Sequence, residues 1–169
     1  GYLIQKSYLK TEINRIKKFD FNTDKTIKGK IISEDEYVEL RTLGCGSIFF
    51  TRLIYHFDLE ELLVIKKPNV KDCEIKKLKE REKNNYLQLN HPLMPKFIGE
   101  TEEGYLIIEY INGKALDVYD KTQLSIEDKI QIIFELILTI EYLHRNHFIY
   151  RDLKPNNIMI DKNKTAVLI

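Results

Sequence analysis

The pattern of apolar and polar residues divides the chain into a strand-rich part and a later helical part. Alternating and β-branched residues at 37–56 and 59–67 predict three strands, the first two joined by a turn that contains glycine. A charged stretch at 72–89 has apolar residues at helical spacing and predicts a helix. Residues 96–111 predict a hairpin of two more strands. This part of the chain is therefore expected to be a sheet with one helix.

The pattern becomes helical after residue 112. Ser125, followed three residues later by Asp128, is typical of a capping box at the start of a helix. Apolar residues then recur at 126, 130, 133, 137 and 140. Because this helix is apolar on nearly all sides, we expect it to contact neighbours on several faces. A polar loop at 145–157 and a hairpin turned at 161–164 complete the pattern.

The N-terminal residues differ in composition from the rest of the chain. Residues 1–36 are rich in Lys, Asn, Asp and Thr, with one short helical pattern and no chemical motif. We interpret them as an extension or linker. The change from strands to helix near residue 112 then predicts two lobes, at 37–111 and 112–169.

Composition favours a soluble globular protein, because 43% of the residues are hydrophobic and 31% are charged. The 27 basic and 26 acidic side chains nearly cancel, so no overall field attracts nucleic acid or an anionic membrane. The most apolar run, 132–143, is too short to span a membrane. Two cysteines, Cys45 and Cys73, are too few for a disulfide framework, and no secretory signal pattern is present. We expect a reducing, cytoplasmic location.

The first candidate for chemistry is the turn "LGCGSIFF" at 43–50. Gly44 and Gly46 would let backbone N–H groups approach a ligand, and phosphate is the usual ligand of such a loop. By itself the pattern favours an ordinary hairpin that needs glycine for positive φ. It is neither a Rossmann fingerprint, because a strand follows it, nor a Walker loop, because the Gly-Lys-Ser/Thr ending is absent.

The second candidate is the pair Lys66 and Glu82. Glu82 lies on the apolar stripe of the predicted helix, four residues from both Leu78 and Tyr86. A buried carboxylate needs a cation, and Lys66 at the end of an apolar strand is a plausible partner. The alternative is that Glu82 extends to solvent and Lys66 is an ordinary lysine at a strand end.

The third candidate is the polar loop "YRDLKPNN" at 150–157. Asp152 could accept a proton from a hydroxyl, Lys154 could neutralise phosphate charge, and Asn157 could coordinate a metal ion. Together these are the groups that phosphoryl transfer requires. The alternative is a surface turn with ordinary polar residues.

This loop closely resembles the H-R-D-L-K-P-x-N catalytic loop of eukaryotic protein kinases. The other pieces follow in that family's order: "LGCGSIF" resembles the Gly-rich loop, "LVIK" the V-A-I-K strand and "LIIEYINGKAL" the hinge, while Glu82 falls where the helix glutamate stands. The resemblance covers about 37–169, and the Leu-Lys-Pro sequence is similar to that of Ser/Thr kinases. It implies an α+β fold with a complete N-terminal lobe, a five-stranded antiparallel sheet plus one helix, and the beginning of a helical C-terminal lobe.

The resemblance also implies ATP and Mg²⁺ as cofactors and a protein substrate, and it leaves the oligomeric state open. Asp152 would deprotonate the substrate hydroxyl, Lys154 would stabilise the transferring phosphoryl group, and Asn157 would bind magnesium. Lys66 would hold the α and β phosphates and pair with Glu82. The residues expected to line the nucleotide are Leu43, Gly44, Cys45, Gly46, Thr51, Val64, Lys66, Ile108, Glu109, Ile111 and Met159.

The sequence departs from the family pattern at several positions. Phe49 replaces the third glycine of the loop, which makes the loop bulkier over the γ-phosphate. Thr51 and Val64 replace the usual Val and Ala around adenine, and Tyr150 replaces the His of the catalytic loop, a change that we interpret as packing.

In the family, the strand at 165–169 leads into an Asp-Phe-Gly sequence that holds the principal magnesium ion. Because the sequence stops at Ile169, we expect a kinase fragment with little or no activity by itself. Two other classes are possible: a pseudokinase that binds a nucleotide or partner, and a small-molecule kinase of related fold. The joint presence of Lys66, Glu82, Asp152 and Asn157 disfavours the first, and the Leu-Lys-Pro sequence disfavours the second.

Overall fold

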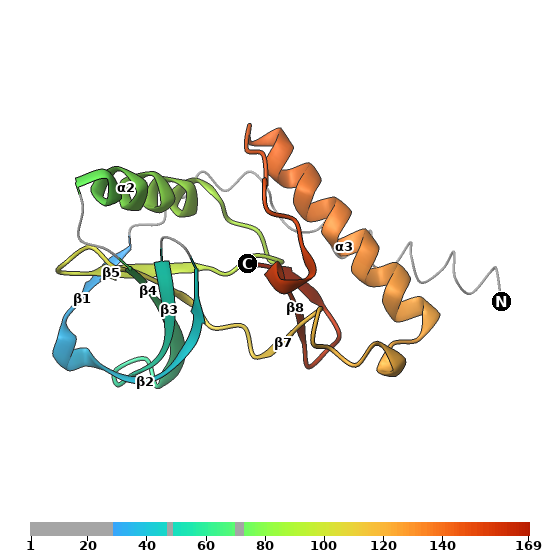
Figure 1. Ribbon diagram of the computed structural model, residues 1–169, viewed down its shortest axis with the longest axis horizontal. Helices are drawn as coiled ribbons and strands as arrows, with labels where there is room; N and C mark the ends of the chain where they lie inside the picture. The colour runs from blue at the N-terminus through green and yellow to red at the C-terminus, as the bar shows by residue number, and fades with distance from the viewer. Residues whose placement is uncertain (1–28, 47–48, 70–72) are drawn as a thin grey trace.

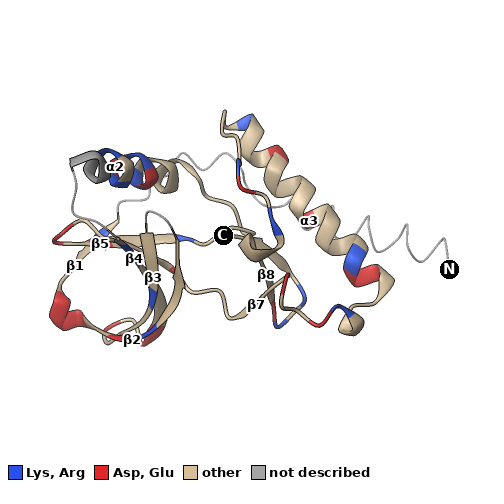
Figure 2. Ribbon diagram, viewed as in Figure 1, with Lys and Arg blue, Asp and Glu red and all other residues tan. Residues whose placement is uncertain are grey.

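A computed structural model of the protein describes residues 29–46, 49–69 and 73–169. It shows a sheet covered by one helix, and a second body in which a long helix lies against a small sheet (Figure 1). Both signs of charge occur on both bodies (Figure 2), in agreement with the nearly equal numbers of basic and acidic residues. None of the helices in these described ranges is long and apolar enough to cross a lipid bilayer.

The first sheet has six strands in the order β1-β5-β6-β4-β3-β2. Their bounds are β1 (Lys30–Ile32), β2 (Tyr37–Cys45), β3 (Phe49–His56), β4 (Glu61–Pro68), β5 (Phe97–Thr101) and β6 (Leu106–Glu109). Strands β2 to β6 pair antiparallel with their neighbours, so the predicted five-stranded antiparallel sheet is confirmed. The sixth strand, β1, was not predicted and pairs with β5 in parallel.

Strand β1 can pair with β5 because residue 99 is glycine. A Cβ atom at Gly99 would lie 2.1 Å from the carbonyl oxygen of Lys30, closer than any side chain can approach. A short 3-10 helix, η1 (Glu34–Glu36), then leads into β2, and the Phe57 N–H donates to the Glu36 carbonyl at 2.8 Å. Part of the predicted N-terminal extension, from residue 30 onward, thus belongs to the sheet.

The sheet buries apolar side chains on both faces. One face packs Ile32, Tyr37, Ile54, Leu63, Ile65 and Ile107 together. The other packs Val64, Phe97, Leu106 and Ile108 together with residues of helix α2 (Cys73–Gln88). Burial on two faces explains why β4 reads as a continuous apolar run instead of a simple alternation. The predicted helix is confirmed, and it begins directly beside the sheet that it covers (Figure 1).

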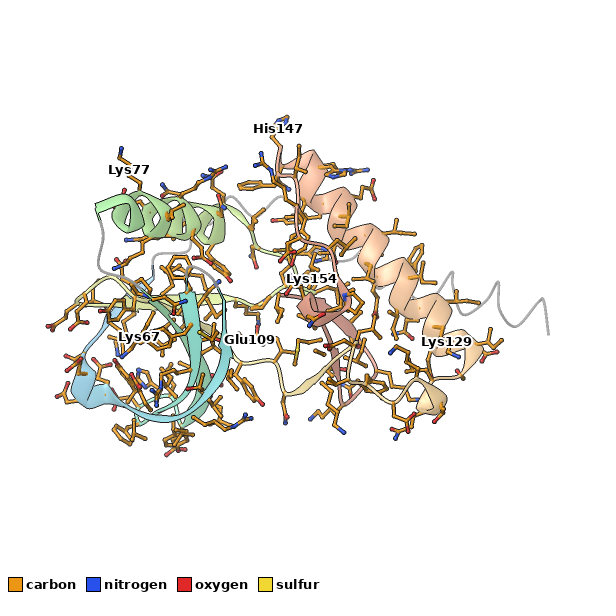
Figure 3. The ribbon with its side chains drawn as sticks, in the orientation of Figure 1. Lys67, Lys77, Glu109, Lys129, His147 and Lys154 are labelled. Atoms are coloured by element: carbon orange, nitrogen blue, oxygen red, sulfur yellow. The ribbon has the colours of Figure 1, made fainter. Side chains whose placement is uncertain are left out.

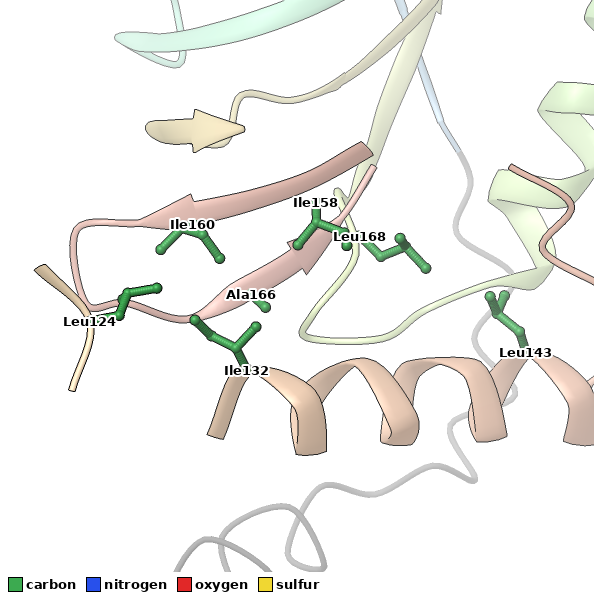
Figure 4. Close-up of a cluster of buried hydrophobic side chains, with 7 residues drawn as sticks. All are labelled: Leu124, Ile132, Leu143, Ile158, Ile160, Ala166 and Leu168. Atoms are coloured by element: carbon green, nitrogen blue, oxygen red, sulfur yellow. The ribbon is translucent and has the colours of Figure 1, made fainter. Parts of the chain in front are cut away.

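The second body consists of helix α3 (Ile126–Arg145) and a sheet ordered β7-β8-β9. The strands are β7 (Gly113–Ala115), β8 (Ile158–Asp161) and β9 (Ala166–Leu168), and two 3-10 helices, η2 (Lys121–Gln123) and η3 (Pro155–Asn157), precede α3 and β8. Its core is formed by Leu124, Ile132, Leu143, Ile158, Ile160, Ala166 and Leu168 (Figure 4). The predicted hairpin and helix are present, and so is the capping box, with the Asp128 N–H donating to Ser125 Oγ at 3.0 Å.

Helix α3 packs through one face only within the described part of the chain. Its buried residues are Ile132, Glu135, Thr139 and Leu143. The apolar residues Ile126, Ile130, Ile133 and Ile137 are 42% to 66% exposed. The expectation of neighbours on several faces is therefore not met among these residues. The buried polar groups are satisfied: Glu135 Oε2 accepts the Ala166 N–H at 2.7 Å, and the Thr139 hydroxyl donates to the Glu135 carbonyl at 2.9 Å.

Candidate active site

An ion pair joins Lys66, near the end of strand β4, to Glu82, in the second half of helix α2. Lys66 Nζ contacts Glu82 Oε1, and the two side chains are only 20% and 22% exposed. Burial opposes the charge of Lys66, but nearby Tyr86 and Glu82 outweigh it, so the pKa of Lys66 lies above its ordinary value. The second carboxylate oxygen of Glu82 is buried and has no hydrogen-bond partner among the described residues. The sequence left open whether Glu82 pairs with Lys66 or extends to solvent, and in the structure the two are paired.

Two aromatic rings complete the surroundings of Lys66. Its Nζ lies 5.6 Å from the centre of the Tyr86 ring and 5.9 Å from that of Phe49. Tyr86 follows Glu82 by one helical turn and stacks on Phe97, with ring centres 6.3 Å apart. Burial raises the pKa of the Tyr86 phenol, so Tyr86 is neutral at physiological pH and Glu82 is the counter-ion of Lys66.

The glycine-containing turn between β2 and β3 is a closed hairpin. The Gly46 N–H donates to the Phe49 carbonyl at 2.8 Å, and the Asn69 side-chain amide donates to the Gly46 carbonyl. Thr51 Oγ1 donates to the Gly44 carbonyl at 3.4 Å, and Cys45 is exposed. Among the described glycines only Gly104 has a positive φ. The sequence favoured an ordinary hairpin that needs glycine for positive φ. That explanation does not apply to Gly44 or Gly46, because neither has a positive φ.

Four of the residues expected around adenine lie in the first body. Leu43, Val64 and Ile108 pack in one cluster, with Val64 and Ile108 opposite each other on β4 and β6. Glu109 ends β6, where its N–H donates to the Lys96 carbonyl at 2.9 Å and its carboxylate accepts the Lys96 N–H at 3.1 Å.

The remaining two residues lie further along the chain. Figure 3 shows Glu109 where the chain leaves the first body. Ile111 follows two residues later, in the segment that crosses to the second body, and is half-buried. Met159 is half-buried on β8, opposite Ala115 and Val167.

The loop before β8 brings the other three candidates together. Asn157 Nδ2 donates to the carbonyl and to the side-chain Oδ2 of Asp152, both at 2.9 Å. Lys154 Nζ lies 2.8 Å from the same Oδ2. The bonds from Lys154 and Asn157 lower the pKa of Asp152, so this carboxylate is ionised at neutral pH. Because Asp152 and Lys154 are 65% and 50% exposed, a ligand can reach them from solvent.

Tyr150 connects this loop to Ile169, the residue that follows strand β9. Its hydroxyl donates to the Ile169 carbonyl at 2.6 Å, and the Ile169 N–H donates to the Asn157 carbonyl at 2.9 Å. Burial raises the pKa of Tyr150 to about 12, and Asp152 and Lys66 both act on it electrostatically. Tyr150 therefore ties the catalytic loop to the segment that follows β9. From the sequence we interpreted Tyr150 as a packing residue. No pattern in the sequence indicates its hydrogen bond to Ile169, which is 19 residues away.

Oxygen donors suit magnesium, which prefers carboxylate and amide ligands together with substrate phosphates. Asp152 and Asn157 offer such oxygens on one loop, held in place by the bonds between them. The described residues contain no group of three or more His, Cys, Asp or Glu side chains that could hold a metal ion. These residues thus fit a magnesium ion that is shared with a bound phosphate, and they do not form a complete protein cage.

Comparisons with known proteins bear on the family of the chain. A family profile described as "Protein kinase domain" matches residues 37–169. The carbon catabolite-derepressing protein kinase of Saccharomyces cerevisiae is 28% identical over 134 residues, covering 75% of this chain and 21% of its own length. The hormonally up-regulated neu tumor-associated kinase homolog A of Xenopus laevis is 33% identical over 142 residues, covering 79% of this chain and 20% of its own length. The cAMP-dependent protein kinase type 3 of Saccharomyces cerevisiae is 30% identical over 141 residues, 78% of this chain and 35% of its own length. The chain thus spans about a fifth to a third of the length of these relatives.

Proposed function

Because this chain belongs to the protein kinase family, we propose that it is the part of a protein kinase that binds ATP with magnesium and contributes the catalytic loop for transfer of the γ-phosphate to a serine or threonine hydroxyl of a protein, with little or no activity by itself. The observation that carries this proposal is the convergence of Lys154 and Asn157 on the carboxylate of Asp152. The base Asp152, the cation Lys154 and the amide of Asn157 thus lie together on one loop, and these are the groups that phosphoryl transfer needs. The free thiol of Cys45 and the requirement for ATP support a cytoplasmic location as part of the proposal.

The first body supplies nucleotide binding. Lys66, fixed by Glu82, places its ammonium group against the α and β phosphates. Leu43, Val64 and Ile108 form an apolar wall for the adenine ring. Backbone groups of the crossing segment that follows would complete adenine recognition, at the Glu109 carbonyl and the Ile111 N–H.

The second body supplies the chemistry. The ionised Asp152 orients the substrate hydroxyl and accepts its proton while the hydroxyl oxygen bonds to the γ-phosphorus. The bond from the γ-phosphorus to the bridging oxygen breaks at the same time, and ADP leaves with the electron pair. Lys154 neutralises negative charge on the transferring group, and Asn157 keeps the Asp152 carboxylate in position. Asn157 would also hold magnesium together with the bound phosphate, and the ion would supply further charge neutralisation.

Nucleotide binding is tested first by thermal unfolding with and without Mg-ATP. We expect ligand to raise the unfolding temperature of the wild-type chain, because it binds only the folded state, and to have little effect on Lys66→Ala. Lys67→Ala is the matched control, since Lys67 is the next residue on β4 and pairs with Glu39 instead. An equal shift in the wild type and Lys66→Ala would count against the nucleotide site.

Transfer is tested with radiolabelled ATP and a general protein substrate. We expect the chain by itself to label the substrate little or not at all. Any label that the wild type transfers should be lost in Asp152→Asn while the thermal shift by Mg-ATP remains, and Asp117→Asn, an exposed residue of the second body, should change neither. The alternative function is that of a pseudokinase, which the ring of Phe49 against Lys66 favours. Transfer that depends on Asp152 would exclude the pseudokinase.

A further inference from the structure

Three side chains lie around the ammonium group of Lys66. Glu82 contacts it from α2, the Tyr86 ring lies 5.6 Å away, and the Phe49 ring lies 5.9 Å away. Both ring distances are within the range of about 6 Å in which an aromatic face attracts a cation. The group that would hold phosphate therefore already has an aromatic ligand on the side of the glycine-containing turn.

Strand register places Phe49 there. Thr51 lies opposite Lys66 and Phe49 lies opposite Pro68, so Phe49 is a diagonal neighbour of Lys66 on the same face of the sheet. Diagonal neighbours across antiparallel strands are within reach of an aromatic side chain. The adjacent Phe50 lies opposite Lys67 and points to the other face.

The two rings differ in how firmly they are held. Tyr86 belongs to α2 and stacks on Phe97, with the ring planes 24° apart. Phe49 is the half-buried first residue of β3, directly after the turn, and its backbone is held by the bond from Gly46 N–H to the Phe49 carbonyl and by pairing with Pro68 on β4. Rotation of the Phe49 side chain would uncover Lys66 without breaking this hairpin bond, whereas Tyr86 cannot move without disturbing the core.

We propose that Phe49 is a cap on Lys66 that nucleotide phosphate has to displace, while Tyr86 is the fixed wall that keeps Lys66 against Glu82. The part that concerns phosphate rests on the function proposed above, and the cap itself does not. Phosphate is the stronger ligand of an ammonium group, because it offers full negative charge where the ring offers only its quadrupole. The cap thus lowers nucleotide affinity without abolishing it.

The cap is tested without nucleotide by the reactivity of the Lys66 amine. The protein is treated with a limiting amount of an acetylating ester, and the modification of each lysine is measured by mass spectrometry. Phe49→Leu keeps the apolar bulk but removes the aromatic face, and we expect it to raise the labelling of Lys66 several-fold relative to Lys129, an exposed lysine of the second body, in the same sample. Phe50→Leu, on the opposite face of the strand, should leave this ratio unchanged. The same ratio in the wild type and Phe49→Leu would overturn the proposal.

The effect on phosphate is then measured as the Mg-ATP concentration that protects Lys66 from the ester by half. Loss of a ring-to-cation contact of this kind predicts that Phe49→Leu needs about two- to fivefold less nucleotide than the wild type. Weaker or equal protection in Phe49→Leu would overturn the role of Phe49 in affinity. If no variant is protected at any concentration while Phe49→Leu still raises labelling, the proposed nucleotide site fails and the cap on Lys66 stands.

Discussion

Gly99→Ala should detach strand β1 from the sheet. The new methyl group would lie 2.1 Å from the Lys30 carbonyl oxygen, and that atom is backbone, so it cannot rotate away. Strand β1 is short and at the edge, so leaving the sheet is the least costly response. The detachment would expose Ile32, which is fully buried in the wild type, and break the ladder bonds to β5.

The expected loss follows from these two contributions. Exposing a buried isoleucine costs about 1.5–3 kcal/mol, and each lost hydrogen bond adds about 0.5–1.5 kcal/mol, offset by the freedom that the released segment gains. We expect the free energy of unfolding of Gly99→Ala to fall by about 2–4 kcal/mol, measured by urea denaturation. This is a large part of the total for an ordinary domain, which is roughly 5–15 kcal/mol.

A double-mutant cycle separates detachment of β1 from general strain. Ile32→Ala should cost about 2–4 kcal/mol in the wild type and almost nothing in Gly99→Ala, because the side chain is already in water there. Ile160→Ala, in the core of the second body, should cost the same in both backgrounds. If Ile32→Ala costs as much after Gly99→Ala as before it, β1 has stayed in place and the reasoning is wrong.

Two further predictions concern buried polar groups. Glu135→Ala leaves the Ala166 N–H without its acceptor and should lower the free energy of unfolding by about 1–3 kcal/mol in urea, whereas the exposed Glu141→Ala on the same helix should change it by less than about 0.5 kcal/mol. Burial lowers the pKa of His91 to about 4 from an ordinary 6.5, so the unfolded state binds more protons between these pH values. Stability should therefore fall as the pH drops from 6.5 to 4, by up to about 3 kcal/mol, and His91→Gln should flatten this part of the pH profile.

Local signals in the sequence predicted most of the elements correctly. The capping box at Ser125, the hairpin at 96–111 and the strands at 37–67 were all recoverable, because caps, turns and periodicity act over a few residues. Strands β1 and β7 were missed. Each has only three residues, too few to show a period, and each depends on a close backbone approach at a glycine, Gly99 facing β1 and Gly113 within β7, which the sequence pattern does not reveal.

The buried face of α3 could not be predicted from the sequence. The helix is apolar nearly all round, so periodicity does not distinguish the covered face from the exposed one. The covered face includes Glu135 and Thr139, which look unsuitable for a core. They are tolerated because each finds a hydrogen-bond partner, Glu135 with strand β9 and Thr139 with its own helix.

The candidate site divides in the same way. The catalytic-loop residues lie within six positions of one another, so the sequence alone placed them together. The pairing of Lys66 with Glu82 remained one of two alternatives until the fold brought α2 over the end of β4. The sequence showed that Phe49 makes the turn bulkier, but the position of its ring against Lys66 depends on the register of β3 with β4.

The sequence by itself therefore determined the family, the order of the elements and the identity of the chemical groups, because motifs and periodicity are local properties. Tertiary structure alone decided which distant segments touch: β1 against β5 across Gly99, Tyr150 against the end of β9, and two aromatic rings around Lys66. These contacts depend on strand register and on how closely backbones can approach, and neither is encoded in any short stretch of residues.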